Sequence, residues 1–334
     1  MHLDSPESGT QSRAMEFPYL QQNINMSQSK ILEVTTLGKS FKSIQAVKDI
    51  SFSLEQGDIF AFLGPNGAGK TTTLRILLDI IKADHGRIAW NINGHGNALP
   101  EAGQIGYLPE ERGLYTDLPV IRSLVYLASI RGMDPSKART AAMDWLERLE
   151  LADRAKEKLQ TLSKGNQQKI QFIASILHKP AFAILDEPFA GLDPVNQEKF
   201  IGYIKELNEG GTTILVSSHQ MPLVEKIANK VFLINNGEGL YNGTLTDIYK
   251  NFGQQHILDI SFSTEVPHNE LQLIAFAENI VTEGEQQVKI TFRAGIELNQ
   301  ILGRLAGIGG ISNIKSHNSS LHDIFLNIVK AHQP

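Results

Sequence analysis

The feature that most constrains this chain is the segment GPNGAGKT, Gly64 to Thr71. It matches the pattern G-x-x-x-x-G-K-[ST], follows a strand-like run at 58–63 and opens a helical run. Glycines let successive backbone N–H groups converge on phosphate oxygens, and a helix N-terminus favours negative charge. Lys70 is placed to reach β and γ phosphates, and Thr71 to offer its hydroxyl to Mg2+. The alternative is a glycine-rich turn with a chance lysine, but the flanking strand and helix favour a phosphate-binding loop.

A second motif, ILDEP, places two carboxylates at the end of an apolar run at 181–187. Beside a phosphate-binding loop, Asp186 is expected to hold Mg2+ and Glu187 to orient or deprotonate a water molecule. Taken alone, DEP also fits a solvated acidic turn. His219, which ends the run TTILVSSH, is the weakest signal, because a lone histidine after a strand is most often structural.

The stretch LSKGNQQKIQ, residues 162–171, begins a helix. Ser163 is a good N-cap, and apolar residues recur at helical spacing until Lys179-Pro180 stops the run. This local structure leaves the polar residues 164–169 unexplained.

Composition limits the remaining possibilities. A chain of 334 residues suggests two domains, and its net charge of -5 argues against a nucleic acid as the main partner. The absence of cysteine excludes disulfides and thiolate zinc sites and fits a reducing compartment. No apolar run approaches the ~20 residues of a membrane-spanning helix, so a soluble, intracellular chain is expected. Residues 1–30 are polar and are expected to form a disordered tail, in which Met26 is a candidate start.

The pattern of the first half is that of an α/β domain. Strand-like runs at 31–37 and 46–54 predict a short, mostly antiparallel β-layer, followed by a buried strand at 58–64. A helix is expected at 71–86, ending at Gly86, and residues 116–160 read almost entirely as a helical insert.

Buried parallel strands are expected at 181–187 and 212–219. A terminal hairpin is expected at 231–243, with its turn at Asn236-Gly237. Beyond Tyr249 the pattern changes, and the order of elements suits a small ferredoxin-like unit. Its elements are strand 257–263, helix 267–276, strands 279–283 and 287–292, helix 295–306, strand 311–317 and helix 320–331.

Taken in order, GPNGAGKT, LSKGNQQ, ILDEP, AGLDP and SSH resemble the nucleotide-binding subunit of ABC transporters over about residues 31 to 245. The resemblance implies an α/β fold, the P-loop NTPase ABC cassette, with a mixed core sheet, an antiparallel β-layer and a helical subdomain. The expected boundaries are 31–250 for the cassette, about 110–178 for the helical subdomain and 256–334 for a small α+β accessory domain.

In that family, the LSGGQ-like signature completes the ATP site of the opposite subunit in a head-to-tail dimer. The resemblance therefore implies that Ser163, Gly165 and their helix N-terminus hold the γ-phosphate of the partner's ATP. It also implies a homodimer, or a heterodimer with a related ATPase, closed by two ATP molecules.

The resemblance assigns further roles residue by residue. Phe41 looks like the aromatic that stacks on adenine, although a buried aromatic at a strand end is the alternative. Glu187 is similar to the catalytic base, His219 to the switch histidine that contacts the γ-phosphate, and Asp193 to the D-loop aspartate. The expected ATP-binding residues of the loop are Gly64, Pro65, Asn66, Gly67, Ala68, Gly69, Lys70, Thr71 and Thr72.

Two departures from the family pattern stand out. LSKGNQQ has Lys164 and Asn166 where glycine and glutamine are commonest. In IGYLPEERGLY, the position of the Q-loop glutamine is Glu110, an anion close to the expected metal. The expected metal ligands are thus Thr71, Asp186 and Glu110.

YLPEERGLY and the C-terminal SLHDIFLNIV resemble one branch, the ATPases of ABC-2 type exporters, including the sodium-efflux kind. The amphipathic SLHDIFLNIV is expected to pack on its own small domain. The implied function is ATP hydrolysis that drives a separately encoded multi-span permease from the cytoplasmic face of the membrane. The alternatives are a non-transport ABC ATPase of translation or DNA maintenance, and an unrelated P-loop kinase or GTPase that leaves LSKGNQQ and SSH unexplained.

Overall fold

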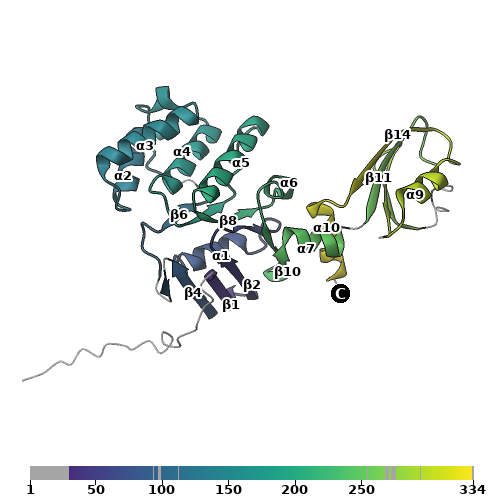
Figure 1. Cartoon of the computed structure of the whole chain (residues 1–334), viewed down its shortest axis with the longest axis horizontal. Coiled ribbons are helices and arrows are strands. Elements are labelled where there is room, and N and C mark those ends of the chain that lie inside the picture. The colour runs from purple at the N-terminus through teal and green to yellow at the C-terminus, as the bar shows by residue number, and fades with distance from the viewer. Residues whose placement is uncertain are drawn as a thin grey trace, which may run out of the picture.

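The computed structural model places an α/β cassette at the N-terminal side and a smaller sheet at the C-terminal side (Figure 1). The tail expected at 1–30 lies outside the described residues except for Lys30, which begins the first strand. The described residues are 30–92, 94–96, 99–111, 113–253, 255–267, 271, 276–293 and 295–332.

The expected antiparallel layer is present as a four-stranded sheet, in which the strands lie in the order β2-β1-β4-β5. Its strands are β1 (Lys30–Phe41), β2 (Ile44–Glu55), β4 (His85–Ile92) and β5 (His95–Gly96).

The helix expected at 71–86 is wrong in its C-terminal half, because α1 spans only Lys70–Leu77. Gly86 lies in β4 and does not cap a helix. Its φ is 97°, and a Cβ there would meet the carbonyl oxygen of Thr36 at 2.5 Å. Glycine is therefore needed at this position because two strands approach closely, a requirement that a helix-ending glycine resembles in sequence.

The core sheet has the order β10-β9-β3-β8-β7-β6, with parallel pairing from β9 to β6 and an antiparallel edge strand β10. Alternation along β3 fills two cores, since Ala61 and Leu63 pack with the helices while Phe60 and Phe62 pack toward the antiparallel layer. The strands are β3 (Ile59–Leu63), β6 (Ile105–Leu108), β7 (Phe182–Asp186), β8 (Thr213–Ser218), β9 (Lys230–Asn235) and β10 (Glu238–Thr244).

The predicted hairpin is confirmed, because Asn235 pairs with Glu238 across a two-residue turn. Asn236 and Gly237 both have positive φ, 49° and 81°, as a type I′ turn requires.

The helical insert consists of α2 (Val120–Ser129), α3 (Pro135–Arg148) and α4 (Lys164–Ile176), with short 3-10 turns at Ala152–Arg154 and Leu159–Thr161. Trp145 of α3 joins this insert to the core. Its ring packs edge-on against Phe172 of α4 and against Tyr203 of α5 (Pro194–Glu209).

The C-terminal sheet has the order β12-β13-β11-β14, all antiparallel. Numbered within the unit, this is 2-3-1-4, the ferredoxin-like order. Its elements are β11 (His256–Phe262), β12 (Ala277–Thr282), β13 (Gln287–Phe292), α9 (Leu298–Leu305) and β14 (Ile311–Asn318). Most of the helix expected at 267–276 lies outside the described residues.

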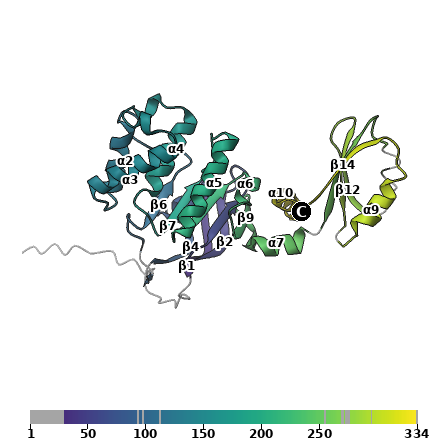
Figure 2. The ribbon, with the colours of Figure 1, turned by 45° about the horizontal axis from the view of Figure 1, so that its top comes forward.

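The last helix, α10 (Leu321–Ala331), does not pack on the core of its own unit. Leu321, Ile324, Phe325 and Ile328 belong to the buried cluster of the cassette, whereas α9 and the sheet form a separate cluster. The expectation that this helix packs on the small domain is therefore wrong. In Figures 1 and 2, α10 lies beside α6 (Met221–Val224) and α7 (Leu245–Phe252), between the cassette and the C-terminal sheet. The division of the chain into domains stays a prediction.

Candidate nucleotide site

The glycine-rich loop lies between β3 and α1, at the edge where the parallel strands end. Gly64 and Gly69 are locked against neighbouring backbone, since a Cβ on them would lie 2.2 Å from the Ile234 carbonyl oxygen and 2.4 Å from that of Ala46. Gly67 has a φ of 79°. The loop thus folds as the phosphate cradle requires. The hollow at the loop is lined by Ala46, Asn66, Gly67, Gly69, Lys70, Thr71, Thr72, Glu110 and Glu187.

Lys70 is a buried cation among carboxylates. Its Nζ donates hydrogen bonds to the carbonyl oxygens of Gly64 (2.8 Å) and Pro65 (3.1 Å), and it lies 3.8 Å from Glu187 Oε1. Burial lowers the pKa of Lys70, while the negative charges of Glu187, Asp186 and Glu110 oppose that shift. The ammonium group of Lys70 is therefore held at the loop, where it could pair with the negative charge of a bound triphosphate.

Oxygen atoms gather around Thr71. Its Oγ1 lies 3.0 Å from Asp186 Oδ2 and 3.3 Å from Glu110 Oε2. Burial raises the pKa of Asp186, although the hydroxyls of Ser217 and Thr71 stabilise its charged form by hydrogen bonding. A hydroxyl and two carboxylates are the hard oxygen donors that suit Mg2+, so these three side chains fit the ion that the sequence predicts.

Glu187 is almost fully buried at the end of β7 and has a positive φ of 50°. Its Oε1 accepts the backbone N–H of His219 at 3.0 Å and lies 2.8 Å from His219 Nδ1. Its Oε2 accepts a hydrogen bond from Ser218 Oγ at 3.3 Å. The structure therefore brings Glu187 and His219 together, as two consecutive parallel strands that end at one edge would place them.

The signature segment begins α4. The hydroxyl of Ser163 accepts the backbone N–H of Asn166, and both Ser163 and Lys164 are exposed. A Cβ on Gly165 would lie 2.9 Å from the carbonyl oxygen of Gly191, so glycine allows α4 to approach the AGLDP loop. These exposed residues are available to a second molecule.

Two buried glutamines of the same helix escaped the sequence analysis. Gln168 donates to the carbonyl oxygens of Glu187 (3.3 Å) and Pro188 (3.2 Å). Gln171 donates to those of Pro109 (2.9 Å) and Glu111 (3.2 Å), on both sides of Glu110. The helix α4 thus holds the backbone at Glu187 and on both sides of Glu110. For Gln171, which stands between Ile170 and Phe172, a polar residue within an apolar run is a signal that could have revealed it, whereas Gln168 follows polar neighbours and has no such signal.

Two other candidates lie away from the loop. Phe41 ends β1 with 46% of its surface exposed, so it is not the buried aromatic of the alternative interpretation, and Lys39 Nζ lies 5.4 Å from its ring centre. Phe41 is not among the residues that line the hollow at the loop. Asp193 caps α5 by accepting the backbone N–H of Asn196, and these hydrogen bonds lower the pKa of its exposed carboxyl.

Comparisons with known proteins agree with this geometry. Residues 47–190 match the family model described as ABC transporter. The chain is 37% identical to an uncharacterized ABC transporter ATP-binding protein, YhaQ, of Bacillus subtilis, over 90% of this chain and 99% of the relative. It is 32% identical to the linearmycin resistance ATP-binding protein LnrL of the same species, over 89% of this chain and 98% of the relative.

Solved structures give the same result. The structure of an ATP-binding subunit of an ABC transporter matches with a TM-score of 0.60 at 29% identity, covering 66% of this chain and 93% of the other. A dimeric cassette, MJ0796, bound to ADP and Pi shares the fold, with a TM-score of 0.59 at 23% identity, covering 64% and 99%. The chain therefore belongs to the ATP-binding proteins of ABC transporters, and it is an ATPase subunit of this family.

Proposed function

We propose that this ATPase hydrolyses Mg-ATP in a head-to-tail dimer, with Glu187 as the base, and that it drives an exporter of the ABC-2 type. The observation that carries the catalytic part is the contact between Glu187 and His219 beside Lys70. A buried carboxylate that is held in place by a histidine and a serine is positioned to orient a water molecule and accept its proton.

The other residues supply charge and position. Lys70 and the N–H groups of the loop bind the β and γ phosphates, and Phe41 stacks on the adenine. His219 approaches the γ-phosphate from the end of β8. When bound by Thr71, Asp186 and Glu110, Mg2+ would neutralise charge on the phosphates.

The exposed signature residues support the dimer. Ser163 and the first N–H groups of α4 form a helix N-terminus with an exposed cation, Lys164, beside it. Such an end favours an anion, and we assign to it the γ-phosphate of the ATP bound by the opposite subunit. The second subunit is a copy of this chain or a related ATPase.

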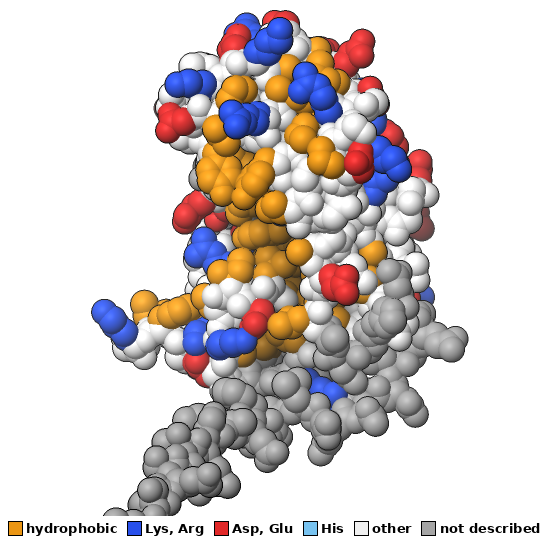
Figure 3. Space-filling model, turned by 90° about the vertical axis from the view of Figure 1, so that its left-hand side faces the viewer, with side chains coloured by type: hydrophobic (Ala, Val, Ile, Leu, Met, Phe, Trp, Pro, Cys, Tyr) orange, Lys and Arg blue, Asp and Glu red, His pale blue; other side chains and the backbone are white. Residues whose placement is uncertain are grey.

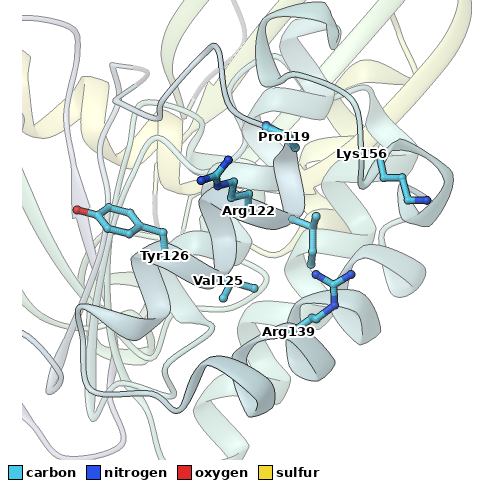
Figure 4. A pocket seen from close by; sticks show the side chains of 7 residues that line it. Pro119, Arg122, Val125, Tyr126, Arg139 and Lys156 are labelled. Carbon is cyan, nitrogen blue, oxygen red and sulfur yellow. The ribbon is translucent and has the colours of Figure 1, made fainter.

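The partner in the membrane is a multi-span permease, which we place on the face formed by α2. Figure 3 shows a band of hydrophobic side chains along this face. A hollow of about 460 Å3 beside α2 is lined by Pro119, Ile121, Val125 and Tyr126 together with three exposed cations, Arg122, Arg139 and Lys156 (Figure 4). Exposed Tyr126 and Ile130 extend the apolar surface along α2. Such patches typically mark interaction sites.

Export is favoured by the name of one relative, the lipopolysaccharide export system ATP-binding protein LptB of Haemophilus influenzae, which is 30% identical over 64% of this chain and 90% of the relative. None of the helices in the described parts of the chain has the length and hydropathy of a membrane span. From membership of the ABC transporter family we propose a peripheral position on the cytoplasmic face, held by the permease.

Co-purification with the multi-span protein encoded by a neighbouring gene tests this proposal. Tyr126→Asp and Ile130→Asp should abolish co-purification and leave ATP binding unchanged, because they place charge on the apolar band. Lys205→Asp, on the exposed surface of α5, is the control. If the α2 variants still retain the permease, the docking face is wrong; if no permease is retained by the unmodified chain, the transport role fails.

A further inference from the structure

We infer that the C-terminal helix α10 is a positioning element for His219, acting through α6, and that the C-terminal unit thereby controls the rate of ATP hydrolysis. This rests on the proposed role of His219 at the γ-phosphate. The rate of ATP hydrolysis would then depend on α10, which lies more than one hundred residues after His219 in the sequence.

A short path joins His219 to α6. Gln220 follows His219 directly, and it is the residue before α6 (Met221–Val224). The backbone N–H of Gln220 donates to Ser218 Oγ at 2.9 Å, and that hydroxyl donates to Glu187 Oε2 at 3.3 Å. A displacement of α6 therefore reaches His219 through the single residue that joins them.

The helices α6 and α10 contact each other. Met221 and Val224 are buried in the cluster that also contains Phe325 and Ile328 of α10. A helix of four residues has little stability of its own, so its position depends on what packs against it. Both α10 and β8 pack against α6.

A polar contact also connects the end of α6 with the start of α10. Glu225, directly after α6, accepts the backbone N–H of Leu321 at 3.4 Å, at the first turn of α10. Asp323 in that turn caps the helix together with Ser320, and it accepts a hydrogen bond from Lys289 Nζ at 2.9 Å.

Lys289 belongs to β13, so the chain of contacts continues into the C-terminal sheet. The path therefore runs from the sheet to Asp323, along α10 to α6, and from α6 to His219. A movement of the C-terminal unit changes the place of the histidine at the reacting phosphate.

The test compares neighbouring residues of α10 in the full chain. Phe325 is 6% exposed and belongs to the buried cluster that also contains Met221 and Val224 of α6, whereas Leu326 is 41% exposed and lies outside that cluster. Phe325→Ala should lower kcat for ATP by about ten-fold with little change in KM, because small displacements of a catalytic group cost large factors in rate. Leu326→Ala should leave both constants unchanged. Glu225→Ala against Lys226→Ala repeats the comparison at the polar contact.

The control for a merely structural effect is the double mutant. In a His219→Ala background, Phe325→Ala should cause no further loss of kcat, since the two act through one group. Residual hydrolysis is followed over hours so that slow rates are quantified. Independent losses, or an unchanged kcat in Phe325→Ala, overturn the inference. If His219→Ala itself hydrolyses ATP normally, the proposed role of His219 fails first.

Hydrogen exchange gives a second reading that does not depend on activity. Backbone amides of residues 219–228 should exchange faster in Phe325→Ala than in the unmodified chain or in Leu326→Ala. Equal exchange in the three proteins contradicts a positioning role for α10.

Discussion

The side-chain amide of Gln168 donates a hydrogen bond to the backbone carbonyl oxygen of Glu187, across 3.3 Å. The helix that begins with the signature residues is therefore tied to the backbone of the residue that we assign as the base. Because that helix also offers Ser163 to a second molecule, a displacement on dimer formation reaches Glu187 without an intervening loop.

Gln168→Ala should lower kcat, because the carbonyl oxygens of Glu187 and Pro188 each lose a hydrogen bond from α4, and that of Glu187 keeps only the N–H of Ala190. The free energy of unfolding should fall by about 1–3 kcal/mol, the usual cost of removing the partner of a buried acceptor. The matched control is Gln167→Ala, since Gln167 also donates to two carbonyl oxygens, those of Leu159 and Leu162. Urea unfolding and steady-state kinetics should show destabilisation in both variants but a kcat defect only in Gln168→Ala.

Lys70→Ala should abolish ATP binding, because it removes the cation that faces the β and γ phosphates and leaves Asp186, Glu187 and Glu110 without a compensating charge. Lys82→Ala, at an exposed lysine with 80% of its side chain accessible, should bind ATP normally. Nucleotide titration by fluorescence or calorimetry measures the difference. Unchanged affinity in Lys70→Ala would remove the loop from the ATP site.

Glu110→Gln should shift the Mg2+ dependence of hydrolysis to higher concentrations, because it removes one negative charge beside Thr71. Glu111→Gln is the matched control, since the neighbouring carboxylate is 85% exposed and 3.6 Å from Arg75. Initial rates over a range of Mg2+ concentrations at fixed ATP are sufficient. Overlapping titrations for the two variants would place Glu110 outside the metal site.

Glu187→Gln should bind ATP but hydrolyse it about 100- to 10,000-fold more slowly, and the ATP-closed dimer should accumulate. Size-exclusion chromatography with Mg-ATP detects the dimer. In this background Lys164→Glu should restore the monomer, because it sets a carboxylate against the partner's γ-phosphate.

Lys205→Glu carries the same charge change on α5 and should leave the dimer intact. Lys164 is a cleaner site than Gly165, because a Cβ on Gly165 would meet Gly191 of its own chain at 2.9 Å. A dimer that survives Lys164→Glu would argue that the signature is only a helix start.

The sequence predicted those parts of the fold that depend on local chemistry. The glycines of the loop, the continuous apolar run of β3 and the Asn236-Gly237 turn are each visible within a few residues, so their elements were found. Gly86 was misplaced because a positive φ is common to helix ends and to close strand contacts. A glycine in the sequence indicates that a positive φ is allowed, but it does not say whether a helix end or a neighbouring strand requires it.

Long-range packing could not be predicted in the same way. The apolar pattern of α10 predicted a helix, but the pattern of an amphipathic helix does not say which surface it covers. Its partner, α6, is too short to show any periodicity. Similarly, Gln168 looked like one more polar residue of the helix start. The carbonyl oxygens that accept its hydrogen bonds belong to the loop after β7, which is distant in the sequence.

The placement of Trp145 makes the chain an optical reporter of its own motion. The chain has two tryptophans, and Trp90 is 2% exposed within the core beneath the antiparallel layer. Trp145 sits between the helical insert and α5, with the Arg148 guanidinium 4.1 Å from its ring centre. Rotation of the insert against the core would change the surroundings of one indole and leave the other as an internal reference. A rotation of the insert driven by nucleotide should therefore change the tryptophan emission of the unlabelled protein.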